Sequence, residues 1–461
     1  MISRKDKFAG IDIGTTTICC VVIDGPTGEA ITAISHPNDS FIPTSAFWER
    51  IQKPDKIIQI VQELLEGVKK QFPDIAGIAV TGQMHGVLYV DESGDAVSPL
   101  FTWQDGRGNL QEDGMTFAKK LSELTGYRLA TGFGWVTHYF NQNHGLIPDA
   151  ARRLCTIQDY AVMKLSSTSI PLMDLTNAES LGCFNFNTLD FDFDALRRAE
   201  VDVSFAPEII RSVEPVGVTR DRVAVFPALG DNQASFIGSV RDKETSVLLN
   251  IGTGSQVSVF SEEFVFTPGI EVRPYPGGGY LLAGSPLCGG RAYTLLRDFF
   301  EMTVKLFSHA PRVTNPADFY SIMNTAAIDA IHTGNRLAVD TRFSGTRHEP
   351  EIRGRISNID IGNFTPENLT AGFITGIVME LYNLFRLLPE SYREKIRVIV
   401  GSGNGLRNNP AMQAAVKNIF QLELKLPLFS EEAAYGAALM ALAGAGRHSS
   451  LDNISQFIRY I

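Results

Sequence analysis

The sequence contains few cysteines, and their spacing gives them no obvious chemical task. The five are Cys19, Cys20, Cys155, Cys183 and Cys288, and no two of them form a C-x-x-C pair. An odd number of cysteines without such pairs fits a reducing compartment better than a disulfide framework. We therefore expect five buried thiols and a cytoplasmic protein.

Long apolar runs and long basic runs are also missing. The N-terminal MISRKDKF leads directly into a strand-like segment without the features of a signal peptide, and no later apolar run reaches membrane length. The formal net charge is −10, and no Lys/Arg run offers the basic footprint that a nucleic-acid backbone requires. The sequence thus predicts no membrane span, no nucleic-acid partner and a small ligand.

Metal-ligand spacings and the common catalytic motifs are absent as well. The eight histidines fall at no metal-ligand spacing, and the chain has neither a Walker-type loop nor a Ser/His/Asp nucleophile elbow. We expect no tightly held structural metal. The 461 residues have an ordinary globular composition, and this length allows two or three packed domains.

The sequence does contain a turn motif that occurs twice. Residues 8–24 consist of two β-branched runs joined by DIGTTT, which predicts a β-hairpin. Residues 249–255, LNIGTGS, match residues 11–17, IDIGTTT, position for position at an offset of about half the chain. Such internal similarity suggests two related lobes, each with a hairpin turn facing a shared cleft.

The paired turns favour a phosphate-binding interpretation. Gly14 permits a backbone conformation that side chains forbid, and the threonines after it, Thr15, Thr16 and Thr17, offer hydroxyls and backbone N–H groups around one concavity. An ordinary hairpin turn without a ligand is the alternative, and the repeat argues against it. Asp12 is replaced by Asn250 in the second copy, so only the first turn can supply a charge directed at a metal ion.

Two clusters of polar and aromatic residues are candidates for a sugar site. Gln83, Met84 and His85 follow a predicted strand over residues 75–80, and ligands of α/β sheets lie beyond such strand ends. Trp103 and Asp105 lie in a turn that also carries an arginine, at position 107. Core burial of the tryptophan and a surface ion pair of the Asp with that Arg are the structural alternatives.

Asp231 is the candidate general base. It precedes a predicted helix over residues 232–240 and lies shortly before the second hairpin. An Asp at a helix start is most often an N-cap that satisfies backbone N–H groups. Its closeness in sequence to the second hairpin favours the catalytic interpretation instead.

The second half contains further Gly-rich turns beside predicted helices. Gly290 opens a helix that extends to residue 300, and a long apolar-periodic helix covers residues 366–388. Gly401, Gly403 and Asn404 lie in a turn between a strand at 398–400 and a helix that starts at Pro410, so a helix N-terminus faces the expected cleft. A helix rich in small residues covers 432–445. The elements of residues 157–211 cannot be assigned from the pattern.

These motifs together resemble the FGGY carbohydrate kinases, and the resemblance covers nearly the whole chain. It implies an α/β fold with two lobes and a central cleft, the actin-like ATPase (ribonuclease H-like) fold. An N-terminal FGGY domain over residues 1–240 would hold the sugar and the first phosphate hairpin. A C-terminal FGGY domain over residues 241–461 would hold the nucleotide. The partners would be a sugar and ATP, and a homodimer is compatible with the family.

The resemblance also assigns expected roles to single residues. Asp231 would be the catalytic base and would touch the sugar, and Asp12 and Asp231 would hold Mg²⁺ with ATP, through water, which needs only one or two carboxylates. The expected sugar-binding residues are Gln83, Met84, His85, Trp103 and Asp105. The expected nucleotide-binding residues are Asp12, Gly14, Thr15, Thr16, Thr17, Gly252, Thr253, Gly254, Gly290, Gly401, Gly403, Asn404, Asn408 and Asn409. The last two are alternatives, because residues 405–407 lengthen the usual spacing to the Asn near adenine.

The expected reaction is ATP-dependent phosphorylation of a ketose. Within the family the resemblance is strongest to kinases of sedoheptulose, through residues 102–107, 130–134, 159–160 and 171–178. Phosphorylation of D-xylulose or another ketose is the nearest alternative, because Gln83, Met84 and His85 do not separate five-carbon from seven-carbon sugars. An actin-like ATP-binding scaffold or sensor without a sugar substrate is an alternative from another class.

Overall fold

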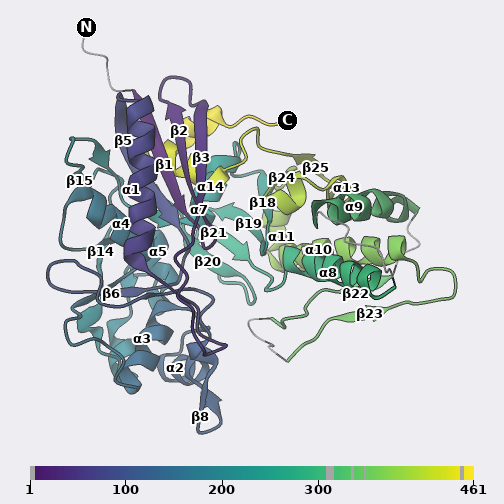
Figure 1. Ribbon diagram of the computed structural model, residues 1–461, viewed down its shortest axis with the longest axis horizontal. Coiled ribbons are helices and arrows are strands. Elements are labelled where there is room, and N and C mark those ends of the chain that lie inside the picture. Colours follow the sequence, from purple (N-terminus) through teal and green to yellow (C-terminus); the bar gives the residue numbers. More distant parts are fainter. Residues whose placement is uncertain (1–5, 308–315, 334–336, 347–348, 350, 447–450) are drawn as a thin grey trace. The chain divides into compact units, whose positions relative to one another are not determined.

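The computed structural model describes residues 6–307, 316–333, 337–346, 349, 351–446 and 451–461 (Figure 1). The chain folds into two compact units. Unit 1 comprises Met1–Arg241, Arg273–Gly279 and Glu431–Ile458, and unit 2 comprises Asp242–Val272, Tyr280–Ser430 and Arg459–Ile461. Two segments from beyond residue 241 therefore pack in unit 1. The expected division into residues 1–240 and 241–461 does not include these two returns.

The sheet of unit 1 is built on the predicted hairpin. Strands β1 (Lys7–Ile13) and β2 (Thr17–Asp24) pair antiparallel with Ile13 opposite Ile18, which confirms the expected hairpin. Strand β5 (Ile75–Gly82) pairs parallel with β1 on the other side. The strand order is β3-β2-β1-β5-β16-β15, where the outer strands are β3 (Ala30–Pro37), β16 (Ala224–Val225) and β15 (Gly217–Val218).

The sheet of unit 2 repeats this arrangement. Strands β18 (Ser246–Ile251) and β19 (Ser255–Ser261) form the second hairpin, and β24 (Val398–Ser402) pairs parallel with β18. The order β21-β19-β18-β24-β25, completed by β21 (Tyr280–Gly284) and β25 (Glu423–Lys425), corresponds strand for strand to β3-β2-β1-β5-β16. The internal similarity seen around two turns thus extends to the sheets that carry them.

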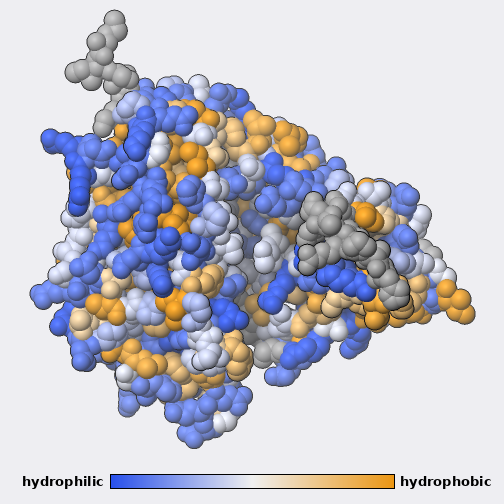
Figure 2. Space-filling model, in the orientation of Figure 1, coloured by the Kyte–Doolittle hydropathy of each residue, from blue (hydrophilic) through white to orange (hydrophobic). Residues whose placement is uncertain are grey.

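Helices cover the sheet of unit 1 because its strands are apolar on both faces. Phe8 on one face of β1 and Ile11 and Ile13 on the other face are completely buried. Helix α1 (Pro54–Gln71) and helix α4 (Ile157–Ser166) pack apolar residues against this sheet, in a cluster that includes Val61 and Tyr160. The outward face of α1 is largely hydrophilic (Figure 2). The predicted helix over residues 55–72 is confirmed.

Helix α14 (Glu432–Gly444) comes from the end of the chain but packs in unit 1, against α7 (Asp231–Ser239) and β1 (Figure 1). The contacts are close because the facing residues are small. A β-carbon on Gly436 would lie 1.9 Å from the carbonyl oxygen of Ala234, and one on Gly10 would lie 1.9 Å from that of Ala434. This packing explains the small residues of the predicted 432–445 helix.

The remaining elements support these two sheets. In unit 1 they include β4 (Ile51–Gln52), β6 (Leu88–Val90), β7 (Leu100–Phe101), α2 (Phe117–Thr125), α3 (Gly134–Asn143), β10 (Arg153–Cys155), β11 (Leu172–Asp174), α5 (Leu175–Ser180), β12 (Phe184–Asn185), β13 (Asp190–Phe191), α6 (Phe193–Arg198), β14 (Glu208–Ile210), β17 (Leu229–Gly230) and α15 (Leu451–Ile454). In unit 2 they include α8 (Gly290–Phe307), α9 (Pro316–Thr333), β22 (Ala338–Asp340), β23 (Arg355–Ser357), α10 (Pro366–Leu387), α11 (Glu390–Arg393), α12 (Asn404–Arg407) and α13 (Pro410–Phe420). Strand β20 (Glu271–Pro274) spans the boundary between the units.

The helices and the cysteines agree with the expectations except at the end of one helix. The long helix expected over 366–388 is α10, whereas α8 continues to Phe307, beyond the expected end at residue 300. Residues 157–211, left unassigned, fold into α4, α5, α6 and short strands. All five cysteines are free and buried, as expected. In the described part of the chain, no helix combines the length and apolarity needed to cross a bilayer.

Candidate active site

The turn between β1 and β2 is held in place through its carbonyl oxygens. Asn38 Nδ2 donates to the oxygen of Gly14 at 2.9 Å, and the Asn38 N–H donates to that of Thr16 at 2.9 Å. Gln52 Nε2 donates to the oxygen of Thr15 at 3.0 Å. Because a trans peptide points its C=O and its N–H in opposite directions, these bonds direct the N–H groups that follow away from Asn38 and Gln52. The turn thus presents backbone donors of the kind that bind phosphate oxygens.

Asp12 lies at the end of β1, immediately before this turn, and is partly buried. Burial, together with the neighbouring carboxylates of Asp231 and Glu431, raises the pKa of its carboxyl from 3.8 to about 7. Glu431 precedes α14, so the last part of the chain brings a third carboxylate to this place. The concentration of negative charge favours the approach of a cation.

Asp231 is the first residue of α7, but its side chain does not cap the helix. The cap position belongs to Gly230, and no side-chain cap hydrogen bond is formed there. The N-cap alternative is therefore wrong. Burial raises the pKa of the Asp231 carboxyl to about 6, while Arg273 and the N–H of Asn232 oppose this rise. A carboxylate with such a pKa is ionised at neutral pH and can accept a proton.

Arg273 is a residue of this site that the sequence analysis missed. Its side chain is 4% exposed, and its Nη1 lies 3.7 Å from the sulfur of Met84. Helix α7 holds the segment that carries Arg273, because Gln233 Nε2 donates to the oxygen of Pro274 at 3.0 Å. Arg273 lies in a strand, 189 positions from Met84 in the sequence. No local sequence pattern could therefore have identified it.

The donor set around Asp12 suits a magnesium ion that arrives with phosphates. Carboxylate oxygens from Asp12, Asp231 and Glu431 are near enough for their charges to interact, and oxygen is the ligand that Mg²⁺ prefers. Among the described residues, no group of three or more His, Cys, Asp or Glu side chains is arranged to hold a metal by itself. The residues present therefore fit an ion whose other ligands are water and phosphate oxygens.

Three of the expected sugar residues lie on the same side of unit 1 as the phosphate turn. Gln83 follows β5 and is 3% exposed, and its neighbour Met84 contacts Arg273 as described. Trp103 is 42% exposed, so core burial is the wrong alternative for it. Its Nε1 donates to Thr15 Oγ1 at 3.0 Å, which brings the tryptophan next to the phosphate turn.

His85 has an unusual backbone conformation for a side-chain-bearing residue. Its φ is 70°, a strained value that is often found at functional sites. Its Nδ1 lies 2.7 Å from the carbonyl oxygen of Ser180, and its ring stacks on Phe133 with 4.6 Å between the ring centroids. Because Nδ1 must then carry the proton of the neutral ring, Nε2 is the acceptor nitrogen.

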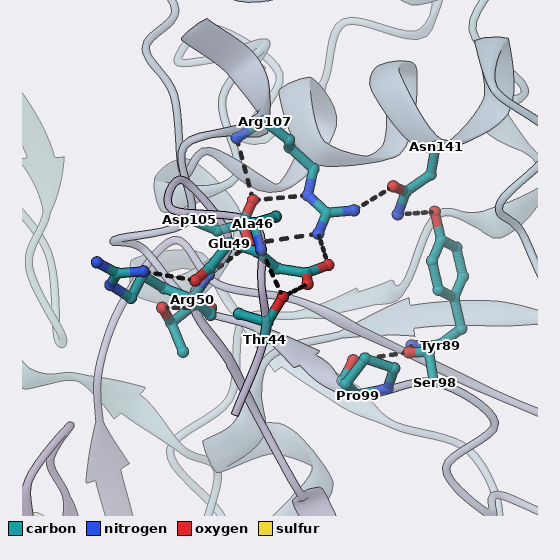
Figure 3. A network of polar contacts seen from close by, with 11 residues as sticks. Thr44, Ala46, Glu49, Arg50, Tyr89, Ser98, Pro99, Asp105, Arg107 and Asn141 are labelled. Atoms are coloured by element: carbon teal, nitrogen blue, oxygen red, sulfur yellow. Dashed lines mark hydrogen bonds and ion pairs between the residues drawn. The ribbon is translucent and has the colours of Figure 1, made fainter. Parts of the chain in front are cut away.

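Asp105 is completely buried, unlike the other expected sugar residues. Its Oδ1 accepts from Arg107 Nε at 2.6 Å, and its Oδ2 accepts from the Arg50 N–H at 3.0 Å (Figure 3). Arg107 also donates to Asn141 and is 2% exposed, so the surface ion pair considered above is wrong. A sugar hydroxyl would reach Asp105 only by displacing one of these partners.

The second hairpin turn, in unit 2, is packed against the start of α8. A β-carbon on Gly290 would lie 1.9 Å from the carbonyl oxygen of Gly252, and the Arg291 N–H donates to the oxygen of Thr253 at 2.9 Å. Gly254 lies in the same turn. The structure thus brings the expected residues Gly252, Thr253, Gly254 and Gly290 together.

The expected adenosine loop lies next to that hairpin. Gly403 has a φ of +81°, and a β-carbon there would lie 2.6 Å from the oxygen of Ile251. Gly401 is the last residue but one of β24, and α12 begins at Asn404. The two candidate asparagines differ: Asn408 is exposed, whereas Asn409 is buried and caps α13 by accepting from the Met412 N–H at 3.0 Å.

Comparison with known proteins identifies relatives along the whole chain. Residues 8–248 match the N-terminal domain of the FGGY family of carbohydrate kinases, and residues 247–445 match its C-terminal domain. The sedoheptulokinase of Mus musculus is 29% identical, covering 96% of this chain and 98% of the relative. The sedoheptulokinase of Homo sapiens is 29% identical, covering 94% of this chain and 96% of the relative.

Among solved structures, a ligand-bound xylulose kinase from Lactobacillus acidophilus superposes with a TM-score of 0.82. The sequence identity is 19%, and the match covers 99% of this chain and 92% of the other. At this identity the similarity establishes the fold.

Proposed function

The chain belongs to the FGGY family of carbohydrate kinases, and we propose on that premise that it phosphorylates the terminal primary hydroxyl of sedoheptulose with ATP. The family membership confirms the expected enzyme class, an ATP-dependent sugar phosphotransferase, and the expected two-domain actin-like fold. It also argues against the scaffold alternative. The choice of sedoheptulose is supported by the similarity to two sedoheptulokinases over nearly their full length.

The observation that carries the proposed mechanism is the position of Asp231. Its carboxylate starts α7 without capping it, and it shares unit 1 with the phosphate turn and with Met84. We assign it the removal of the proton from the attacking sugar hydroxyl. Phosphoryl transfer depends mainly on positioning and on charge stabilisation, so a well-placed carboxylate and the N–H groups of Thr15, Thr16 and Thr17 suit the reaction.

Asp12 and Asp231 would hold Mg²⁺ that arrives with ATP, through water, and Glu431 adds charge beside them. When bound, the ion offsets the negative charge of the phosphate oxygens. Arg273 supplies a second positive charge, and its guanidinium keeps Asp231 as a carboxylate. We propose that Arg273 also orients the sugar, because it lies against Met84.

For the sugar we propose contacts with Gln83, Met84, His85 and Trp103. Nε2 of His85 would accept a hydrogen bond from a hydroxyl, and the exposed ring of Trp103 would cover an apolar face. For Asp105 we propose a positioning role in place of direct contact, because its oxygens already hold Arg50 and Arg107.

For ATP we propose one turn from each unit. Gly14 with Thr15, Thr16 and Thr17 would bind phosphate in unit 1, and Gly252, Thr253, Gly254 and Gly290 in unit 2. Gly401, Gly403 and Asn404 would face the adenosine, with Asn408 or Asn409 beside the adenine. A cytoplasmic location is part of the proposal, in keeping with the free cysteines, and a homodimer stays a prediction for size-exclusion chromatography.

The decisive experiment is ATP consumption with a panel of sugars: sedoheptulose, D-xylulose, D-ribulose, L-fuculose and glycerol, with Asp231→Asn as the blank. We expect sedoheptulose to give the highest kcat/KM. A preference for D-xylulose would favour the alternative that the Lactobacillus acidophilus structure represents. If no sugar raises turnover above the blank, the proposed function is wrong.

A further inference from the structure

We infer that Gln52 is a positioning residue that couples the sugar site to the phosphate turn, so that sugar and ATP strengthen each other's binding. The inference rests on the proposed function and adds a regulatory property to the same site. Gln52 lies in β4 and is completely buried. The sequence analysis gave it no role.

The side chain of Gln52 closes a ring of hydrogen bonds with Thr15 and Gln83. Thr15 Oγ1 donates to Gln83 Oε1 at 3.4 Å, and Gln83 Nε2 donates to Gln52 Oε1 at 2.8 Å. Gln52 Nε2 then donates to the carbonyl oxygen of Thr15 at 3.0 Å. Trp103 Nε1 joins the ring from outside by donating to Thr15 Oγ1 at 3.0 Å.

The donors in this ring all run in one direction. An amide has a donor end and an acceptor end, and each glutamine uses its acceptor end for the preceding member and its donor end for the next. Rotating either amide by half a turn would place donor against donor or acceptor against acceptor. Gln83 and Gln52 therefore have one satisfied arrangement, which fixes Thr15 at the same time.

The backbone around Gln52 adds rigidity to this arrangement. Strand β4 pairs antiparallel with β7, with Gln52 opposite Leu100, and β7 leads directly into Trp103. The N–H of Lys53 donates to the oxygen of Ser40 at 2.9 Å. The same small sheet thus carries both Gln52 and the segment of Trp103, so the two sides of the ring cannot move independently without breaking backbone hydrogen bonds.

A sugar that contacts Gln83 or Trp103 would act on groups whose other hydrogen bonds hold Thr15. Sugar binding would restrict these side chains to the orientation that also fixes the turn, and a phosphate bound at the turn would restrict them from the other end. Coupling of two binding sites is reciprocal. Sugar should therefore raise the affinity for nucleotide by the same factor by which nucleotide raises the affinity for sugar.

The test measures the dissociation constant of a non-hydrolysable ATP analogue with MgCl₂, in the presence and absence of sedoheptulose, by isothermal titration calorimetry. For the wild type we expect sedoheptulose to tighten nucleotide binding at least about 5-fold. Gln52→Met keeps the side-chain length but removes both hydrogen bonds, and it should reduce the factor to below about 2-fold. Gln59→Met is the matched control, because Gln59 is exposed on α1 and hydrogen-bonds only Glu63 in the described contacts.

Trp103→Phe is the second variant, and its exposed position makes it tolerant of the change. It keeps an aromatic face but lacks the N–H donated to Thr15, so the coupling factor should fall. A purely structural role of Gln52 would instead lower the active fraction and leave the factor unchanged. Unchanged coupling in Gln52→Met, or in Trp103→Phe if Gln52→Met does not fold, overturns the inference.

The outcome is distinguishable from a failure of the proposed function. If the sugar panel selects another substrate, that sugar replaces sedoheptulose in the titration and the same expectations apply. If wild-type protein turns over a sugar but shows no coupling, the inference about Gln52 is wrong while the kinase assignment stands.

Discussion

At the scale of single residues, the proposed catalysis depends on a carboxylate that does not cap the helix it starts. Asp231 starts a helix whose cap position is filled by Gly230, and Arg273 offsets part of the burial that would otherwise favour its protonated form. Arg273 lies far from Asp231 in the sequence, so a helix-capping argument would not consider it.

Replacing the base tests this assignment directly. We expect Asp231→Asn to lower kcat by at least about 100-fold, the lower end of what general-base catalysis contributes, and to leave the affinity for ATP within a few-fold. Steady-state kinetics and nucleotide titration measure the two effects. Asp39→Asn removes a solvent-exposed carboxylate and should retain full activity. Turnover retained in Asp231→Asn would remove this residue as the base.

His85 allows a second test at the same scale. His85→Ala should raise the KM of the sugar more than the KM of ATP, because its ring, which is held by Phe133 and Ser180, belongs to the proposed sugar site. His144→Ala is a suitable control. His144 also stacks on a phenylalanine, Phe140, but it is not one of the proposed site residues. A larger effect of His85→Ala on the KM of ATP would place His85 elsewhere.

At the scale of elements, the close contact between α14 and α7 decides which residues meet. Because small residues face each other, the two helices approach to backbone distance, and the approach brings Glu431 near Asp12. A helix of the same length and polarity but with larger residues at the contact positions, such as Gly436, could not approach as closely. It would stand farther from β1 and would leave Asp12 with fewer charged neighbours.

A methyl group at this contact should be destabilising. Gly436→Ala would place a β-carbon 1.9 Å from the carbonyl oxygen of Ala234, and the forced shift should lower the free energy of unfolding by about 1–3 kcal/mol. Gly67→Ala on α1 is the control, and its effect on the free energy of unfolding should have the opposite sign. No atom lies within 4 Å of the position that the new β-carbon would take. Gly67→Ala should stabilise the protein by about 0.5–1 kcal/mol. Urea denaturation measures both, and equal effects would contradict the packing argument.

At the scale of the whole molecule, two units share a strand order but differ in what their turns can do. Asp12 and Asn250 occupy equivalent places, so only unit 1 carries the carboxylate beside its turn. The chain then returns to unit 1 twice, through Arg273–Gly279 and Glu431–Ile458. The first return carries Arg273, whose charge acts on Asp231, and Glu431, next to the second return's helix, acts on Asp12.

The stability of the folded chain should depend on pH through His138. This residue is fully buried between Tyr89 and the carbonyl oxygen of Asp202, and burial lowers its pKa from 6.5 to about 4. The unfolded chain therefore binds a proton near pH 6.5, whereas the folded chain binds it only near pH 4. The contribution of His138 to the free energy of unfolding is therefore complete above pH 6.5. As the pH falls towards 4, the free energy of unfolding decreases by up to about 3 kcal/mol.

Urea denaturation between pH 4 and pH 7.5 checks this expectation. His138→Gln has no titrating ring, so its free energy of unfolding should fall less steeply with acid than that of the wild type. Because all other titrating groups are common to both proteins, the difference between the two curves isolates His138. Parallel curves would show that this histidine does not contribute.

The sequence by itself determined the features that depend on neighbours along the chain. Turn chemistry identified both hairpins and the glycines that we propose for phosphate binding, and apolar periodicity placed α1 and α10, because backbone conformation and helical faces are set within a few residues. The motifs were also sufficient to indicate the family. Asp231, His85 and Trp103 could be proposed because each lies in or beside such a motif.

Only the tertiary structure decided which distant side chains share the site. Arg273 reaches Met84 across 189 positions, Gln52 reaches both Thr15 and Gln83, and Asp105 is withdrawn into a buried ion pair with Arg107. These outcomes depend on how strands and helices pack, and packing is not encoded in any local pattern. The positions of these side chains therefore depend on burial and on long-range contacts, and residue type alone does not predict them.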